Sequence, residues 1–194
     1  MTAALAATAA LLYALGLLIL AELHLRYPGH RLLRDPVSDY GVGPSKPWFQ
    51  AMGGVGTVAG LLLAGAMARA GLPGWIAACM AASVLARVGV AAFPTDLEGA
   101  APTRAGRLHM LFAVASFALY YTVADNATPL LAAMVSAPWA STLTALRWIA
   151  AAALAALVAC LLLRPLRAWF GLAERVFLIA IPLWFLTASW VLAN

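Results

Sequence analysis

Charged residues are scarce in this sequence, and the acidic ones are the scarcest. Aspartate, glutamate, lysine and arginine together make up 10% of the 194 residues, and only seven residues are acidic. Hydrophobic residues make up 65%, and the mean hydropathy is +0.94. Because a soluble globular domain carries about 25% charged residues, this composition excludes a soluble domain and indicates an integral membrane protein.

Cysteine and lysine are nearly absent. The two cysteines, Cys79 and Cys160, fall at different predicted depths in the membrane, farther apart than the roughly 7 Å that a disulfide allows between Cα atoms. We therefore expect two small, unpaired apolar side chains. The only lysine, Lys46, lies outside the apolar runs, which excludes a retinal-type Schiff base within the membrane.

Six apolar runs fill nearly all of the chain. Each lies within the range of roughly 17–25 residues that a transmembrane helix needs. The sequence therefore predicts an all-α polytopic membrane bundle of six transmembrane helices, organised as a single transmembrane domain over residues 1–194. The predicted spans are Ala3–Leu25, Trp48–Ala70, Leu72–Phe93, Leu108–Ala124, Trp139–Leu163 and Ala173–Leu192.

Positive charge is distributed unevenly among the connections between these runs. The segments after the first, third and fifth runs, together with Arg175 near the start of the sixth, hold nine basic residues, whereas the opposite side holds only Arg69. The positive-inside rule predicts that the side with nine basic residues faces the cytoplasm and that both termini face outward. This topology accounts for the isoelectric point near 9.8 without nucleic-acid binding. The alanine-rich composition favours a bacterial inner membrane, and the lack of a basic residue before Arg26 favours a retained first helix over a signal peptide.

Local signals predict several details. In the first connection, Asp35-Pro36 predicts a helix N-cap followed by proline, which starts one surface turn, and Ser45 is expected to cap the second span. Gly56, Gly60 and Ala64 have the four-residue spacing that lets helix backbones pack closely. Residues 129–138 are too few to cross a bilayer alone, so they either extend the fourth span past a kink or lie along the outer interface.

Polar side chains collect near the predicted cytoplasmic ends of the spans. Ionisable groups at membrane depth are costly and need partners, so we expect these side chains to converge on one cavity. Arg87, inside the third run, is expected to pair with Asp39, Asp96 or Glu22. Arg147 is expected either to snorkel toward the interface or to form an ion pair, with Asp125 near the same side. The candidate pocket residues are Glu22, His24, Ser38, Asp39, Tyr40, Arg87, Thr95, Asp96 and His109.

Three kinds of chemistry are open to this constellation. His24, Asp39, Asp96 and His109 could hold a metal ion of the zinc type, or the two histidines could ligate a haem from both faces. The spacing of these residues matches no known metal-ligand or haem-ligand motif. The simpler interpretation is that each imidazole forms a hydrogen bond with a loop carbonyl. Ser38 could act as a nucleophile beside a base, although no Gly-x-Ser-x-Gly motif is present.

Three short motifs, in this order, resemble a known family. They are His30–Gly41, which ends in Ser-Asp-Tyr-Gly, then Phe93-Pro94-Thr95-Asp96, then Gly106-Arg107-Leu108-His109. Together with the six runs, they resemble the uncharacterised prokaryotic membrane family called domain of unknown function 998. This resemblance implies a six-helix membrane protein and carries over no catalytic residue or cofactor. The order Ser, Asp, His is also similar to seven-helix membrane hydrolases such as alkaline ceramidases, but this chain has neither a seventh run nor a late His-x-x-x-His motif.

The sequence therefore predicts a small membrane protein that binds membrane lipids, or a membrane-protein partner, at a polar pocket near the cytoplasmic interface. The alternative is a metal-assisted or acid–base hydrolase or transferase that acts on lipid headgroups in the same pocket.

Overall fold

The computed structural model describes residues 1–97 and 99–194. It contains six long helices, and no strand occurs in the described part of the chain. All six are long and apolar enough to cross a membrane, which confirms the predicted all-α, multi-pass bundle. The helices are α1 (Thr2–Arg26), α2 (Lys46–Arg69), α3 (Gly74–Ala92), α4 (Arg104–Ala132), α5 (Ala137–Leu162) and α6 (Phe170–Ala193).

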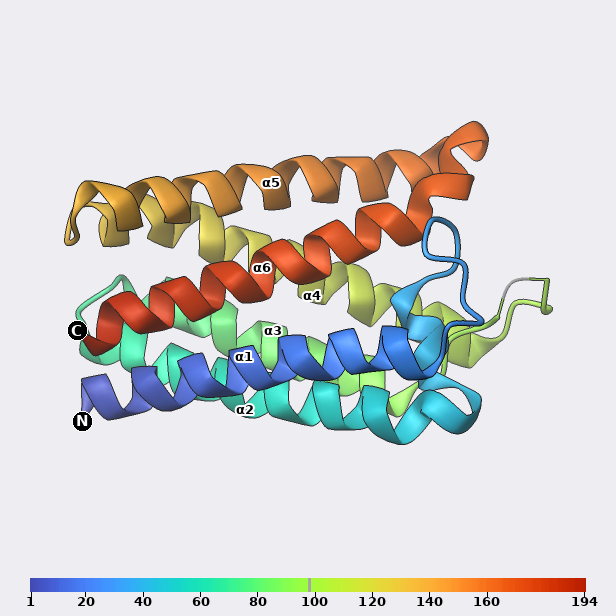
Figure 1. The fold of residues 1–194 in the computed structure, drawn as a ribbon, viewed down its shortest axis with the longest axis horizontal. Helices are drawn as coiled ribbons and strands as arrows, with labels where there is room; N and C mark the ends of the chain where they lie inside the picture. The colour runs from blue at the N-terminus through green and yellow to red at the C-terminus, as the bar shows by residue number, and fades with distance from the viewer. Residues whose placement is uncertain (98) are drawn as a thin grey trace.

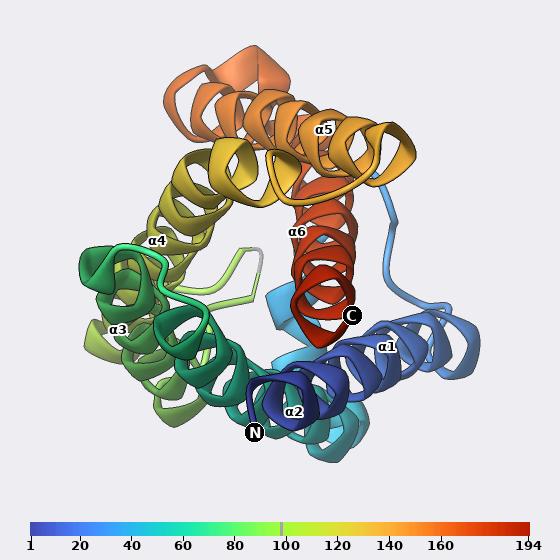
Figure 2. The same ribbon diagram turned by 90° about the vertical axis from the view of Figure 1, so that its left-hand side faces the viewer.

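The helices form a ring in chain order, seen end-on in Figure 2. Each packs against the next along the chain, and α1 closes the ring by packing against α6. α6 also contacts α2 and α4, and half of its apolar window is buried, against 22% for α5. α6 therefore lies nearest the centre of the bundle, and α5 lies mainly on its outside (Figure 1).

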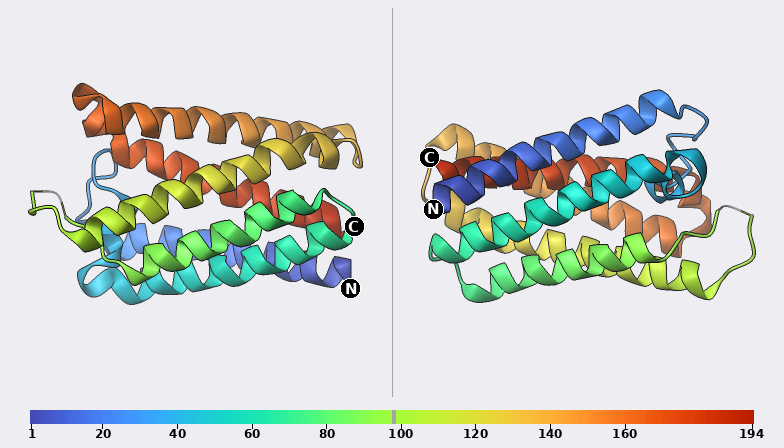
Figure 3. Two further views of the ribbon diagram at one scale, coloured as in Figure 1. Left: turned by 180° about the vertical axis from the view of Figure 1, so that it is seen from behind. Right: turned by 90° about the horizontal axis from the view of Figure 1, so that it is seen from below.

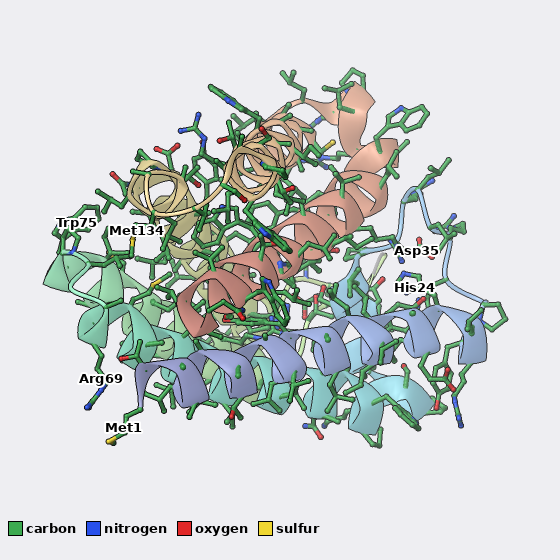
Figure 4. The ribbon with its side chains drawn as sticks, turned by 60° about the vertical axis from the view of Figure 1, so that its left-hand side comes forward. Met1, His24, Asp35, Arg69, Trp75 and Met134 are labelled. Atoms are coloured by element: carbon green, nitrogen blue, oxygen red, sulfur yellow. The ribbon has the colours of Figure 1, made fainter. Side chains whose placement is uncertain are left out.

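The two ends of the bundle differ. One end, which we call the loop end, carries the longer connections 27–45, 93–103 and 163–169 (Figures 1 and 3). The other, the termini end, carries both chain ends and the short connections 70–73 and 133–136. Figure 4 shows His24 and Asp35 at the loop end, and Met1 and Arg69 at the termini end.

Helix α4 is longer than predicted at both ends. It begins at Arg104, because Thr103 is its N-cap and accepts a hydrogen bond from the Gly106 amide through Oγ1 at 3.0 Å. At its other end it continues through Pro129 to Ala132, so the residues after Pro129 extend the fourth span. Lipid offers no partner to free backbone groups, so a continuous helix is favoured even where proline removes one hydrogen bond.

Two packing predictions are confirmed. A Cβ added to Gly60 would lie 2.7 Å from Cγ2 of Val84, so this glycine allows α2 and α3 to approach closely. Arg147 on α5 pairs with Asp125 on α4, at 3.3 Å between Nη1 and Oδ1. Both cysteines are free, as expected.

Candidate functional site

Arg175, near the start of α6, holds the 27–45 connection against the helix bundle. Its side chain is buried, and its Nη1 donates to the carbonyl oxygens of Leu32 at 2.8 Å and Asp35 at 2.7 Å, and also to that of Gly171 in its own helix. Its Nε donates to Nε2 of His24 on α1 at 2.8 Å. One guanidinium thus joins α1, α6 and the connection between α1 and α2.

This contact indicates which ring nitrogen of His24 accepts a hydrogen bond and which one donates. Arginine can only donate hydrogen bonds, so the Nε2 that accepts from Arg175 must carry a lone pair. The other nitrogen, Nδ1, donates to the Leu20 carbonyl oxygen at 2.7 Å. Both ring nitrogens are therefore engaged within the protein, and the ring packs edge-on against Tyr40, with centroids 5.4 Å apart.

Glu174, the neighbour of Arg175, binds the same connection. Its Oε2 accepts a hydrogen bond from the Val37 amide at 2.5 Å, and its side chain is buried. Val37 begins the short 3₁₀ helix η1 (Val37–Gly41). Gly171 is required for this approach, because a Cβ there would lie 2.6 Å from the Asp35 carbonyl oxygen. η1, which carries Ser38, Asp39 and Tyr40, is consequently pinned to the start of α6.

The turn in this connection differs from the prediction at its caps. The N-cap of η1 is Pro36, without a side-chain hydrogen bond. Asp35 instead accepts from the Arg31 amide at 2.7 Å and pairs with the Arg31 guanidinium at 2.9 Å. Ser45 precedes α2 as expected, but its hydroxyl donates to the Val42 carbonyl oxygen rather than capping the helix.

The 93–103 connection is fastened to the start of α4 by the motif residues. Asp96 accepts from the Thr103 amide at 2.9 Å and from its hydroxyl at 2.7 Å; these two hydrogen bonds, the amide first, lower the pKa of Asp96 below its ordinary value. A Cβ on Gly106 would lie 2.0 Å from the Asp96 carboxylate. Nδ1 of His109 donates to the Phe93 carbonyl oxygen at 2.8 Å, which leaves Nε2 for other contacts.

Two adjoining cavities lie between these connections. The larger, which we call the mouth cavity, has a volume of about 650 Å³ and is lined by Asp39, Asp96, Arg34, Arg164 and Arg167 among others. The second, the inner cavity, has a volume of about 260 Å³. The inner cavity shares Pro36, Asp96 and Phe170 with the mouth cavity. Its polar lining residues are Ser38, Thr95, Asp96, His109 and Glu174.

The apolar lining of the inner cavity comes from α4 and α5. Val114 and Phe117 on α4 face Leu157 and Val158 on α5 across it. Val114 and Val158 are also 49% and 47% exposed, so the inner cavity lies next to the outer surface of the bundle. α4 and α5 are the most loosely packed of the neighbouring helix pairs.

Arg87 does not form the predicted ion pair. No carboxylate among residues 1–97 and 99–194 lies within 4 Å of its guanidinium, because Glu22 pairs with Arg26 and Asp96 binds Thr103. Arg87 runs beside Gly56, where an added Cβ would lie 3.5 Å from its Nε. It lines two small spaces inside the bundle, one of them shared with Ser38, His109 and Glu174.

The structure brings together five of the nine predicted pocket residues around the mouth and inner cavities. These are Ser38, Asp39, Thr95, Asp96 and His109. Three others lie outside, contrary to expectation: His24 is held by Arg175, Glu22 pairs with Arg26 at the surface, and Tyr40 is buried beneath the rings of His24 and His30. Arg87 lies deeper in the bundle.

The predicted metal and haem sites both relied on His24. Its two ring nitrogens already bind Leu20 and Arg175, so it offers no ligand atom in this arrangement. In the part of the chain that the structure describes, no group of three or more His, Cys, Asp or Glu side chains is placed to hold a metal ion.

Sequence reasoning missed Glu174 and Arg175. Both fall in the first residues of the predicted sixth span, Ala173–Leu192, where Arg175 counted only as a positive charge beside the membrane. Two adjacent charges of opposite sign inside an apolar run are rare, because charges at membrane depth need partners. That pattern was the available signal.

Comparison with protein families gives one match. The model of a family described as "Protein of unknown function (DUF998)" matches residues 7–191, which confirms the resemblance that the three loop motifs indicated. Comparisons with curated proteins and with solved structures find no match.

Replacing Arg175 tests the role of its hydrogen bonds. Arg175→Ala leaves the carbonyl oxygens of Leu32 and Asp35, which are in part-buried hydrogen bonds, without their donor, and each such loss costs about 1 kcal/mol or more. We expect a free energy of unfolding in detergent lower by about 3 kcal/mol, and faster trypsin cleavage at Arg31 and Arg34. Arg167→Ala, an exposed arginine at the same end, is the control. Equal melting and cleavage in the two variants would contradict the assignment.

Proposed function

We propose that this chain, which belongs to the DUF998 family, binds an anionic membrane lipid at the loop end of its bundle. The lipid headgroup occupies the mouth cavity, and one acyl chain occupies the inner cavity between α4 and α5. The observation that carries this proposal is the junction of an arginine-bearing cavity with an apolar one that lies next to the outer surface of the bundle.

The inner cavity has the chemistry that an acyl chain requires. Its walls on α4 and α5 include valine, leucine and phenylalanine side chains. These apolar side chains have no polar group that contact with methylene groups would desolvate. Val114 and Val158 stand at its outer edge, so a chain can enter sideways from the bilayer. The combined volume of the inner and mouth cavities falls within the range of about 300–1,000 Å³ that is typical of ligand pockets.

The mouth cavity supplies the groups that a phosphate headgroup requires. Arg164 and Arg167 are exposed and line it, together with Arg34. Arginine presents a planar fork of N–H donors that fits phosphate oxygens. Asp39 and Asp96 line the same cavity, and their carboxylates can accept hydrogen bonds from headgroup hydroxyls. A phosphoglycerol headgroup, which carries both a phosphate and hydroxyls, matches this combination best.

The proposed setting is a bacterial inner membrane, with the loop end toward the cytoplasm. The basic residues near the ends of the helices support this orientation, because nine of them belong to the loop end and Arg69 belongs to the termini end. The mouth cavity would then open at the cytoplasmic leaflet, where its arginines would meet anionic headgroups.

An acid–base hydrolase or transferase acting on lipid headgroups is the second candidate. Ser38, His109 and Glu174 line the inner cavity together and also line the small space beyond it. A hydroxyl, an imidazole and a carboxylate are the groups that a nucleophilic mechanism combines. The engaged nitrogens of His24 favour this acid–base form of the enzyme over the metal-assisted form.

Lipid titration followed by native mass spectrometry tests the proposed binding. We expect the purified protein to bind phosphatidylglycerol in preference to phosphatidylcholine. Arg164→Ala and Arg167→Ala should each weaken phosphatidylglycerol binding about fivefold, because one basic residue near an anionic surface contributes about 1 kcal/mol. Arg104→Ala, an exposed arginine at the start of α4 that lines neither cavity, should have little effect.

The acyl-chain site is tested by filling the inner cavity. Val158→Trp should reduce lipid binding, whereas Leu162→Trp, on the same helix but outside the cavity, should not. Equal affinity for both lipids, together with unchanged binding in all of these variants, would contradict the proposal. Release of a lipid fragment that Ser38→Ala and His109→Gln both abolish would favour the enzyme instead.

Fusion proteins test the orientation. Alkaline phosphatase joined after Asn194 should be active, because this enzyme folds only outside the cytoplasm, and a fluorescent protein at the same site should be dark. Phosphatase inserted after Arg164, at the loop end, should be inactive. The reverse pattern at the two sites would overturn the proposed orientation.

A further inference from the structure

A third cavity, separate from the mouth and inner cavities, lies between α1, α2 and α6 near the middle of the bundle. We call it the central cavity; its volume is about 60 Å³. Most of its lining is apolar, with Leu12, Leu17 and Leu20 on α1 and Leu178 and Ile181 on α6. Three side chains carry polar atoms, namely Tyr13, Arg87 and Tyr120.

Arg87 brings a positive charge to this apolar space without a compensating carboxylate. Its guanidinium makes no ion pair and no hydrogen bond to the described residues of the protein. An unpaired charge at membrane depth is costly, and Glu174, the carboxylate that lines the adjoining space, accepts its hydrogen bond from the Val37 amide. The arrangement therefore favours an anion beside Arg87.

The Tyr13 hydroxyl is the second unsatisfied group at this cavity. Tyr13 is only 6% exposed, and its hydroxyl has no hydrogen-bond partner among the described residues. Its ring is fixed, because it stacks on Phe185 with centroids 5.2 Å apart, and Tyr120 packs on the same Phe185 ring at 5.3 Å. A rigid, buried hydroxyl without a partner is unfavourable, and a hydrogen-bond acceptor beside it would satisfy it.

We infer that Arg87 and Tyr13 form a binding site for a carboxylate in the central cavity. A guanidinium only donates, and its planar fork fits the two oxygens of a carboxylate. The Tyr13 hydroxyl supplies a further donor to the same group. A single positive charge matches a single negative one, so a carboxylate fits better than a phosphate dianion.

Two sources of carboxylate fit this chemistry. A long-chain fatty acid would enter from the bilayer between α1 and α6, beside Gly16 and Pro182, which line the cavity. Only its carboxylate would lie in the cavity, which is too small for an acyl chain, and the chain would stay between α1 and α6 in contact with the bilayer. A small carboxylate would arrive from the loop end through the space that Arg87 shares with His109 and Ser38. The site uses no residue of the mouth cavity, so it stands or falls separately from the proposed function.

Equilibrium binding of radiolabelled oleate to the detergent-purified protein tests the site, with acetate as competitor. We expect saturable oleate binding that Tyr13→Phe weakens about tenfold, since a hydrogen bond to a charged group is lost. The Tyr13→Phe variant should melt no lower than the wild type, because the hydroxyl it removes has no protein partner. Competition by acetate would identify a site for small carboxylates, and its failure would identify a site for fatty acids.

Matched glycine variants test the place of binding without touching Arg87. A side chain at Gly16 meets nothing within 4 Å, so Gly16→Leu should fold and should block the cavity, lowering oleate binding at least tenfold. Gly54, which is exposed on α2 and is also free of neighbours, provides the control Gly54→Leu. Absence of saturable binding by the wild type, or binding that Tyr13→Phe and Gly16→Leu both leave unchanged, would overturn the inference.

Discussion

The loop end of this protein is organised around the buried guanidinium of Arg175. Its hydrogen bonds reach His24 on α1, the carbonyl oxygens of Leu32 and Asp35, and Gly171 on α6. Hydrogen bonds that involve a charged group contribute about 1.5–3 kcal/mol each, so this one side chain offsets much of the entropy lost in ordering the long α1–α2 connection. Glu174 adds a second attachment at Val37.

These hydrogen bonds determine which residues line the mouth and inner cavities. η1 stays beside α6, which brings Ser38 and Asp39 to the same space as Asp96 and His109 from the α3–α4 side. That side is fastened by Thr103 and Phe93. Between the two connections, α4 and α5 contact each other less extensively than the other neighbouring helix pairs do. The fold thus places the apolar part of the inner cavity between α4 and α5, where the proposed lipid chain would enter.

Much of the fold could be predicted from the sequence, because a bilayer permits few solutions. Apolar runs must be helices, and Arg147 pairs with Asp125 at the same end of the bundle. The helix ends were less predictable: α4 passed through Pro129 because helical hydrogen bonds have no substitute in lipid, and Thr103 extended its start. These are contributions of single side chains that hydropathy does not reveal.

The candidate site was only partly predictable, because depth in the membrane does not specify direction around a helix. His24 and His109 have similar predicted depths, yet one faces Arg175 and the other lines the inner cavity. Likewise Arg87 was assigned a carboxylate by depth alone, whereas the nearby acids bind closer donors in their own segments: Glu22 binds Arg26, and Asp96 binds Thr103. Glu22 and Asp96 each bind a residue close to them in the chain rather than Arg87.

The central claim is that a lipid chain occupies the space between α4 and α5. An electron-microscopy structure of the protein in nanodiscs that contain phosphatidylglycerol tests it directly. The account predicts chain-shaped density beside Val114 and Val158, continuous with a headgroup that contacts Arg164 and Arg167. A structure in which α4 and α5 close on each other, with lipid confined to the outer surface of the bundle, would contradict it.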